Sequence, residues 1–358
     1  MATYDAVRDL PLEIDSYELE GREAQASPEF VRKTTVIHLR GGGHEGVGED
    51  VTYSSEDQEA LQAEGPTLPL AGSHTLDGFS QLLDRLALFP SGPGMDAFLD
   101  YRRWAYESAA LDLALGQAGL SLAQAVGREP QPVTFVVSLR LDDPPTSAPI
   151  LRLRKGYPTL RFKLDPTGDW TGGLVRELAA LQAVDTLDLK GAYKGTPVDQ
   201  SGDPALYRLV AEAFPSAWIE DPDLNEQTDP VLEPYRDRIT WDAPIHSAAD
   251  IDGLPFPART INFKPSRFGS VQRLFEGYDY CAEQGIAIYG GGQWELGPGR
   301  GQIQYLASLF HPDTPNDVAP AAFNIHRHDP PDGLPTSPLP PQPSATGFRW
   351  GEDHGFRA

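Results

Sequence analysis

Five charged residues follow short apolar segments of the chain, and their side chains are of the types that transfer protons beside a metal ion. The segments TLRF, VDTL, AWI, ITW and TINF are followed, in that order, by Lys163, Asp188, Glu220, Asp242 and Lys264. Three carboxylates that converge on one point repel each other unless a cation joins them, and Mg²⁺ prefers oxygen ligands in octahedral geometry. The sequence therefore predicts that Asp188, Glu220 and Asp242 bind a metal ion.

The two lysines indicate a class of reaction. A metal ion that binds a substrate carboxylate makes the proton on the adjacent carbon removable, and a lysine of lowered pKa can take that proton. A second lysine can return a proton to the other face, or stabilise charge as a leaving group departs. We expect Lys163 and Lys264 to be these catalytic residues.

The elements that would position these residues alternate along the chain from Pro132 onward. Short apolar runs of strand type are separated by helical stretches such as GGLVRELAALQA and PALYRLVAEAF. Repeated alternation of this kind indicates a parallel sheet, and its seven or eight units favour a closed barrel over an open sheet. Chemistry in such a barrel lies at the carboxyl ends of the strands, where the five charged residues are found.

Three parts are expected along the chain. Residues 1–130 form an α+β capping domain, residues 131–325 form a (β/α)7β TIM-like barrel with the catalytic residues, and residues 326–358 form a proline-rich tail that packs near the cap. In the cap, TTVIHLRGGGHEGVGED predicts a hairpin with a glycine turn, and the apolar spacing from about Met95 to Val126 predicts one long helix.

Composition excludes several classes of function. The formal net charge of −23 argues against a nucleic-acid partner, because phosphate binding needs a basic face. A single cysteine, Cys281, excludes an internal disulfide framework and is expected in a helix core. No apolar run reaches the roughly 20 residues that span a membrane, and the N-terminus has no signal-peptide pattern. We therefore expect a cytoplasmic protein with no membrane partner.

Several of these motifs together resemble the enolase superfamily, and within it the muconate-lactonising subgroup. TLRFKLDP, LDLKGAY, WIEDP, TWDAPI and INFKPSRFGS resemble the strands of the two bases and the three metal ligands. The most specific stretch, GIAIYGGGQWELGPGRGQIQYLASLFHPDTPNDVAP, is similar to the branch of o-succinylbenzoate synthases and N-acylamino acid racemases. The resemblance extends roughly from Thr34 to Asp317. It implies Mg²⁺, with Mn²⁺ as a substitute, and a homo-oligomer that acts on a small-molecule carboxylate.

A set of substrate-binding candidates is expected around the metal ion from the strand ends and from this resemblance. It consists of Ser138, Arg161, Lys190, Gly291, Gly292, Gln293 and Glu295. Three of these differ from the usual pattern of the subgroup. Arg161 stands in place of a lysine, Lys190 in place of an asparagine, and Gln293 in a position often held by methionine.

The resemblance implies abstraction of a proton alpha to a carboxylate, which gives a metal-stabilised enediolate. Dehydration of the o-succinylbenzoate synthase type and racemisation of N-acylamino acids are the two leading outcomes. Muconate cycloisomerisation and dipeptide epimerisation are the alternatives among enzymes. A barrel kept as a non-catalytic binding protein is the alternative outside enzymes.

Overall fold

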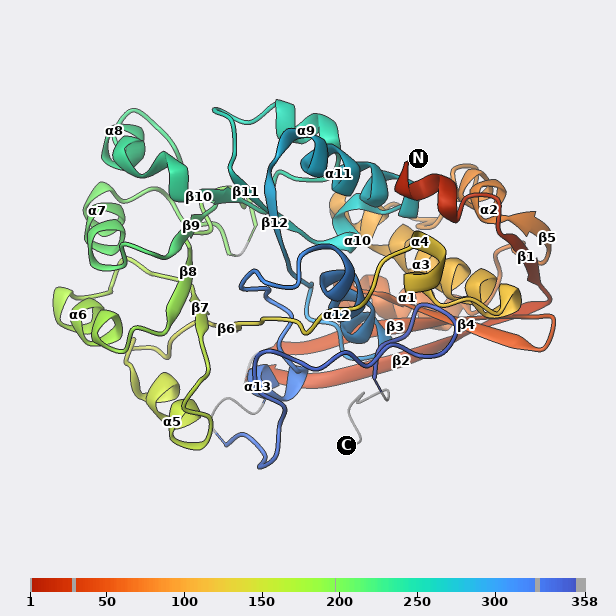
Figure 1. Ribbon diagram of the computed structural model, residues 1–358, viewed down its shortest axis with the longest axis horizontal. Helices are drawn as coiled ribbons and strands as arrows, with labels where there is room; N and C mark the ends of the chain where they lie inside the picture. Colours follow the sequence, from red (N-terminus) through yellow and green to blue (C-terminus); the bar gives the residue numbers. More distant parts are fainter. Residues whose placement is uncertain (1, 28–29, 197, 326–328, 352–358) are drawn as a thin grey trace.

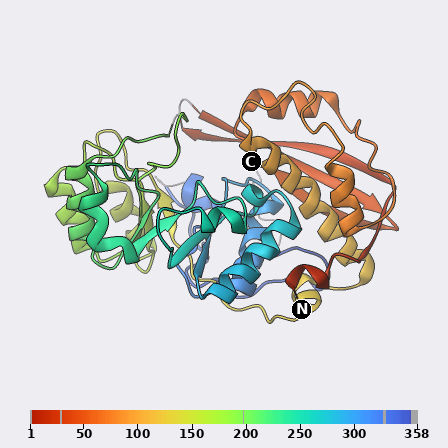
Figure 2. The same ribbon diagram turned by 90° about the horizontal axis from the view of Figure 1, so that it is seen from above.

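The computed structural model describes residues 2–27, 30–196, 198–325 and 329–351, which form a capping domain and a barrel domain side by side (Figures 1 and 2). The chain runs through the cap, then around the barrel, and then back over both domains. The carboxyl ends of the barrel strands carry the candidate site.

The cap is built on an antiparallel three-stranded sheet of β2 (Ser16–Ser27), β3 (Phe30–Gly41) and β4 (His44–Asp50). The predicted hairpin is confirmed as β3–β4, and its turn residues Gly42 and Gly43 have positive φ angles of 54° and 79°, which glycine adopts without steric cost. Alternate residues of β4 are also glycines. A Cβ at Gly46 or Gly48 would lie 2.2 or 2.0 Å from a helix carbonyl, so these glycines let that helix pack directly on the sheet.

The helix on this sheet is α3 (Ala97–Ala118), and it ends earlier than the predicted helix. Gly119 adopts a left-handed φ of 68°, and α4 (Leu122–Val126) begins after Ser121, whose side chain forms a capping box with Gln124. The single helix predicted over this region was therefore wrong, because a glycine C-cap and a serine N-cap divide it. The cap also contains the elements η1 (Thr3–Ala6), β1 (Pro11–Ile14), α1 (Ser55–Glu64), β5 (Gly72–Thr75) and α2 (Leu76–Leu83).

The barrel domain has a parallel sheet with the strand order β12-β11-β10-β9-β8-β7-β6, which confirms the predicted strand–helix alternation. Each strand is short, and the pairs are in regular parallel register except for a shift between β7 and β8. The strands are β6 (Val137–Leu139), β7 (Phe162–Leu164), β8 (Val184–Asp188), β9 (Trp218–Glu220), β10 (Ile239–Trp241), β11 (Thr260–Phe263) and β12 (Ala287–Gly290).

Helices cover the outside of this sheet (Figure 1). Buried apolar residues on one side of each long helix explain the packing; Leu174, Val175 and Leu178 of α6 are examples. The helical elements are α5 (Ala148–Gly156), α6 (Gly172–Ala180), α7 (Pro204–Ala213), α8 (Asp229–Leu232), η2 (Glu233–Arg238), α9 (Ala248–Asp252), α10 (Pro265–Phe268), α11 (Val271–Gln284), α12 (Pro298–Phe310) and α13 (Ala321–Ile325).

A short eighth strand position joins the two ends of the sheet. Asn316 forms a parallel bridge with Phe135, just before β6, and Asp317 forms one with Gly291, just after β12. Backbone bonds from Val136 N to Asn316 O and from Asp317 N to Gly290 O, both 2.8 Å, support the two bridges. The barrel of the predicted (β/α)7β type is thus completed by two residues rather than by a full strand.

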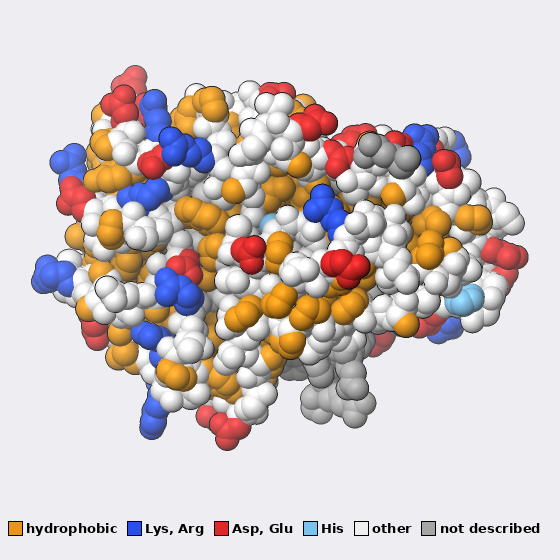
Figure 3. Space-filling model, viewed as in Figure 1, with side chains coloured by type: hydrophobic (Ala, Val, Ile, Leu, Met, Phe, Trp, Pro, Cys, Tyr) orange, Lys and Arg blue, Asp and Glu red, His pale blue; other side chains and the backbone are white. Residues whose placement is uncertain are grey.

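The chain after the barrel crosses both domains. Leu339 exchanges two backbone hydrogen bonds with Val133, and Phe348 lies between the rings of Trp104 from the cap and Tyr305 from the barrel. Within the described residues, the helices are all too short or too polar to cross a membrane. On the face in Figure 3, the described Lys and Arg side chains are scattered among acidic and apolar ones rather than gathered in a stripe.

Candidate active site

Three carboxylates meet at the carboxyl ends of adjacent strands in the middle of the sheet. Asp188 ends β8, Glu220 ends β9, and Asp242 follows β10. Asp188 and Glu220 are direct partners in the strand register, so their side chains leave the sheet on the same side. One carboxylate oxygen from each of the three acids lies within 4.8 Å of the others, and all three residues are fully buried. The three acids could hold a metal ion.

Two lysines flank this acid cluster from the next strands on either side. Lys163 of β7 lies 3.0 Å from Asp188 through its Nζ, and it also pairs with Glu220. Lys264, which follows β11, lies 2.8 Å from Asp242. Both lysines are almost fully buried. The strand order therefore puts one ammonium at each end of a row of three carboxylates.

Polar side chains from other elements orient the carboxylates. Tyr289 of β12 donates a hydrogen bond to Glu220, and Tyr193 donates one to Asp242 Oδ2 at 2.7 Å. Arg267 of α10 is buried, and its Nη1 lies 3.3 Å from Asp242 Oδ1. Such contacts hold metal-binding carboxylates in a fixed orientation.

Asp221 is a buried acid that directly follows Glu220 at the end of β9. Its φ of 47° is left-handed, and this turns its carboxylate back under the next strand, where it accepts hydrogen bonds from Asp242 N and Ala243 N, both at 2.8 Å. Burial raises the pKa of Asp221 to about 7, with further contributions from Asp242 and Asp188. Asp221 therefore positions the backbone that carries the third candidate ligand.

The formal charges of this region are unbalanced by two. In their ordinary charge states the six acids of this region, three of which form the cluster, exceed its four bases by two negative charges. The acids are Asp165, Asp188, Glu220, Asp221, Asp242 and Asp317, and the bases are Lys163, Lys190, Lys264 and Arg267. A divalent cation would supply the missing charge. Asp242 Oδ1, which is buried and accepts no hydrogen bond, is an acceptor suited to it.

The pKa values follow from this charge distribution. Burial by itself would raise the pKa of Asp242, but Arg267 and Lys264 hold it well below the usual range. Burial raises the pKa of Glu220 well above the usual range despite the opposing charge of Lys163. Burial would lower the pKa of Lys163, but Asp188 and Glu220 raise it far above the ordinary value. In this charge state Lys163 is an ammonium, and a divalent ion on the acids would weaken the attraction that retains its proton.

Several predicted substrate-binding residues lie at the same end of the barrel. Ser138 is the register partner of Lys163, so both side chains leave the sheet on the same side. A Cβ at Gly291 would lie 2.9 Å from both Asn262 Oδ1 and Lys264 Cε, so a side chain at this position would have to displace one of these groups. Lys190 lies at the acid cluster itself, because its ammonium pairs with Asp188.

The structure places Arg161, a predicted substrate-binding residue, away from the acid cluster. Its guanidinium pairs with Asp185 and donates to Gln182 O at 3.0 Å, and its side chain is 45% exposed. Both partners precede the end of β8, so Arg161 lies toward the amino ends of the strands. Arg161 precedes β7, and its contacts with Asp185 and Gln182 hold its side chain away from the end of the barrel that carries Lys163.

The loop after β12 carries Gln293 and Glu295, whose side chains bind other protein groups. Gln293 Nε2 donates to Tyr101 OH at 3.0 Å. Glu295 accepts from Gln293 N at 2.6 Å and pairs with Arg300 at 3.0 Å. A Cβ at Gly292 would lie 2.3 Å from Glu295. Gly292 therefore makes room for the Glu295 carboxylate, and the loop is fixed by its own contacts.

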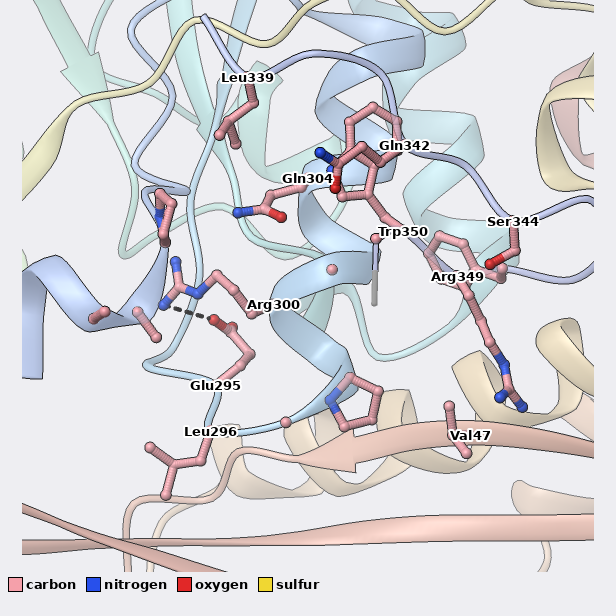
Figure 4. A pocket seen from close by; sticks show the side chains of 18 of the residues that line it. Val47, Glu295, Leu296, Arg300, Gln304, Leu339, Gln342, Ser344, Arg349 and Trp350 are labelled. Atoms are coloured by element: carbon pink, nitrogen blue, oxygen red, sulfur yellow. Dashed lines mark ion pairs between the residues drawn. The ribbon is translucent and has the colours of Figure 1, made fainter. Parts of the chain in front are cut away.

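Glu295 and Arg300 also line a separate cavity of about 680 Å³ between the cap sheet, α12 and the C-terminal segment (Figure 4). Its lining includes Val47, Gln304 and Leu339 but none of the three clustered acids. We place the candidate active site at the barrel strand ends and not in this cavity, because among the described residues only Asp188, Glu220 and Asp242 form a group of three potential metal ligands.

Residues that the sequence did not indicate complete the site. Tyr193, Tyr289, Arg267, Asp317 and Asp165 come from loops or from strand positions that looked apolar. Arg267 was quoted within INFKPSRFGS, and its place three residues after Lys264 was a usable signal. Tyr193 and Tyr289 also stand within LDLKGAY and GIAIYGGG, but nothing in these motifs indicates which acid each tyrosine contacts.

Comparison with known proteins follows the two-domain architecture. Residues 5–125 and 129–325 match the models of the N-terminal and C-terminal domains of a family described as a domain of unknown function (DUF8230). The architecture and the acid cluster define a two-domain barrel protein with the enolase-superfamily fold. The chain belongs to the DUF8230 family, whose C-terminal model alone spans more than half of it.

Curated relatives include an N-succinylamino acid racemase of Thermus thermophilus, 27% identical over 308 residues, which are 81% of this chain and 79% of the relative. An o-succinylbenzoate synthase of Bacillus subtilis is 27% identical over 226 residues, 60% of this chain. That match spans 57% of the synthase, which is less than two thirds of its length. The predicted resemblance to this branch is confirmed by both relatives.

Solved structures of similar fold include a dipeptide epimerase of Methylococcus capsulatus complexed with a Mg ion, with a TM-score of 0.64, 19% identity, and coverage of 85% of this chain and 89% of that one. A muconate lactonizing enzyme of Pseudomonas putida has a TM-score of 0.63 and 18% identity, and the match covers 96% of each chain. These structures show the fold that the chain shares with them.

Proposed function

We propose that this protein is a Mg²⁺-dependent enzyme that removes a proton from the carbon next to a substrate carboxylate. The observation that carries the proposal is the row of three buried acids, Asp188, Glu220 and Asp242, with one lysine at each end. Charged residues at a protein surface would not be buried, and a site that only binds an ion would not need two buried ammonium groups on opposite sides of the acids.

Each residue of the site has a separate proposed role. Asp188, Glu220 and Asp242 would hold the ion, with Asp221, Tyr193 and Tyr289 fixing their orientation. The bound ion supplies positive charge that offsets the negative charge developing on the substrate carboxylate. Lys163 removes or returns a proton at one face of the substrate carbon, and Lys264 does so at the other, because they stand on β7 and after β11, on opposite sides of the acids.

Two reactions fit this arrangement, and the names of the relatives support both. Dehydration, as in an o-succinylbenzoate synthase, needs one lysine to remove a proton and the other to stabilise charge. Racemisation, as in an N-succinylamino acid racemase, needs both lysines to exchange protons. The substrate is in either case a small carboxylate, and we also propose that Mn²⁺ can replace Mg²⁺ and that the protein forms a homo-oligomer.

Proton exchange tests the proposal directly. Wild-type protein with Mg²⁺ in ²H₂O should exchange the α-proton of N-succinyl amino acids or convert the cyclohexadiene substrate of the synthase, as followed by NMR. Lys163→Ala and Lys264→Ala should each lower turnover by about 10² to 10⁴, the usual contribution of a general base. Lys155→Ala, an exposed lysine of α5, should leave it unchanged.

The activity that each lysine variant loses distinguishes racemisation from dehydration. A racemase without one lysine should still exchange the α-proton of one enantiomer through the remaining base, whereas a synthase should depend on a single lysine for proton removal. If the wild-type protein binds Mg²⁺ but exchanges no α-proton in any carboxylate tested, the proposal is wrong. The non-catalytic binding protein is then the remaining hypothesis.

The metal is tested separately by calorimetry. Glu220→Gln should weaken Mg²⁺ binding strongly, because one of three carboxylate ligands loses its charge. Glu226→Gln changes the same residue type on an exposed turn nearby and should leave Mg²⁺ affinity unchanged. Equal Mg²⁺ affinity in wild type and Glu220→Gln would remove Glu220 from the ligand set.

A further inference from the structure

Both oxygens of Asp188 are already in use within the protein. Asp188 Oδ2 pairs with two ammonium groups, those of Lys163 at 3.0 Å and Lys190. Asp188 Oδ1 accepts the backbone N–H of Lys190 at 3.2 Å. A cation that binds Asp188 through Oδ2 would have to displace one of the two ammonium groups, since two ammonium groups and a divalent ion would repel one another on one oxygen.

Lys190 is the ammonium that is free to move. Lys163 belongs to a strand, its side chain is 1% exposed, and it keeps Glu220 as a second partner. Lys190 lies on the turn after β8 with a left-handed φ of 55°, and its side chain is 15% exposed. The flexible four-carbon stem of a lysine on a turn can swing to a new partner.

Asp165 offers that second partner. It follows β7 directly, and its backbone N–H donates to Leu139 O at 3.3 Å, which keeps the residue at the carboxyl end of the barrel. Its Oδ1 is buried and receives no hydrogen bond, a costly state for an acceptor. Asp165 is also the acid that contributes most to the electrostatic stabilisation of the Lys190 ammonium, ahead of Asp188.

We propose that Lys190 is a resident counter-ion with two positions: its ammonium fills part of the cation site on Asp188 and moves to Asp165 when a divalent ion binds. The inference rests on the proposed function, because it assumes that Asp188 is a metal ligand. Lys190 and Asp165 thereby set the affinity for the ion without touching it. An asparagine at position 190 would leave Asp188 Oδ2 without this ammonium partner.

A double-mutant cycle measured by calorimetry with MgCl₂ and no substrate tests this exchange. Lys190→Asn should raise Mg²⁺ affinity by about tenfold, within the coupling range of residues in one ion-pair network. Asp165→Asn should lower it by a similar factor, because Lys190 loses its second position and stays on Asp188. In the Lys190→Asn background, Asp165→Asn should have little further effect.

The cycle also separates the exchange from a general charge effect. A change in field alone would make the two substitutions additive, and additivity would overturn the inference. Lys194→Met removes the same charge from the same loop, at a residue that pairs with Asp199 and Asp223, and should leave Mg²⁺ affinity unchanged. Asparagine tolerates the left-handed φ of position 190, and Lys190→Gly provides a second variant in case the first does not fold.

The outcomes distinguish this inference from the proposed function. If the wild-type protein binds no Mg²⁺, both are overturned. If it binds Mg²⁺ and exchanges α-protons but the cycle is additive, only the two-position lysine is overturned. A non-additive cycle with the expected signs supports it whichever reaction the enzyme catalyses.

Discussion

At the scale of single residues, Asp221 shows how one backbone angle controls the candidate site. An acid beside Glu220 in WIEDP reads as a solvated turn residue, yet its left-handed φ of 47° directs the side chain inward. The carboxylate then accepts both N–H groups at the end of β10, those of Asp242 and Ala243. Asp242 cannot move without breaking these bonds, so Asp221 holds the backbone of a candidate ligand without contacting its carboxylate.

We predict that Asp221→Asn weakens Mg²⁺ binding by about 10- to 100-fold, the usual effect of removing a group that orients a metal ligand. The two N–H groups bind different oxygens of Asp221, and in asparagine one of these becomes an NH₂ group that cannot accept a hydrogen bond. Calorimetry would measure the affinity, with Asp223→Asn as the matched control, because Asp223 accepts a loop N–H from Gly202 away from the cluster. Equal affinities in wild type and Asp221→Asn would contradict the role.

At the scale of elements, the eighth strand position depends on a buried histidine. His311 ends α12 and its Nδ1 lies 2.6 Å from Asn316 Oδ1. Asn316 Nδ2 donates to three carbonyls, including Thr134 O at 3.0 Å, and its Oδ1 accepts from Gly290 N, which fixes the amide orientation. His311 Nδ1 therefore donates, and Nε2 accepts from Tyr278. This network replaces a full strand in closing the barrel.

The histidine predicts a dependence of stability on pH. Burial lowers the pKa of His311 to about 4 from an ordinary 6.5. Because the unfolded chain binds the proton first, the free energy of unfolding should fall as pH decreases from about 6.5 to 4, by on the order of 3 kcal/mol from this group. This contribution is fully present above pH 6.5 and is lost below about 4.

Urea unfolding at pH 7, 6, 5 and 4 would measure this dependence in wild type and in His311→Gln. The glutamine variant is expected to be less stable at pH 7 and to lose less stability on acidification. The difference between the two curves isolates His311 from the many carboxylates that also titrate in this range. Parallel curves would show that His311 is not buried as a neutral group.

At the scale of the whole molecule, the cap, the barrel and the C-terminal segment meet in shared buried groups. Glu49 of the cap accepts N–H groups of Leu296, Gly297 and Gly299 at the start of α12. Asp112 of α3 accepts from Phe348 N at 2.7 Å and pairs with Arg349 at 2.8 Å. Such contacts make the loop after β12 and the C-terminal segment part of the same cooperative structure.

Phe348→Ala should lower the free energy of unfolding of both domains together by about 3–5 kcal/mol, as expected when a buried aromatic side chain is lost. Phe348 is fully buried and contacts Trp104 and Tyr305, one ring from each domain. Calorimetry should show one transition shifted to lower temperature. Leu151→Ala, at a residue that is 45% exposed, should change stability by no more than about 0.5 kcal/mol. Two separate transitions would contradict the shared core.

The order of the elements and the membership of the acid cluster could be predicted from the sequence. Strand runs of β-branched and apolar residues that end in a charge are local patterns, and parallel strands bring their carboxyl ends to one edge whatever the details of packing. Asp188, Glu220, Asp242, Lys163 and Lys264 therefore followed from position alone.

Only the tertiary structure decided how these residues are supported. Arg161 lies outside the acid cluster because its guanidinium pairs with Asp185 and Gln182 O of a neighbouring segment, and Asp221 lies inside it because of one left-handed backbone angle. Tyr289 reaches Glu220 across 69 positions of sequence. A periodic pattern records which side of its own element a residue faces, but a hydrogen bond between distant elements depends on how those elements pack, and no local pattern contains that information.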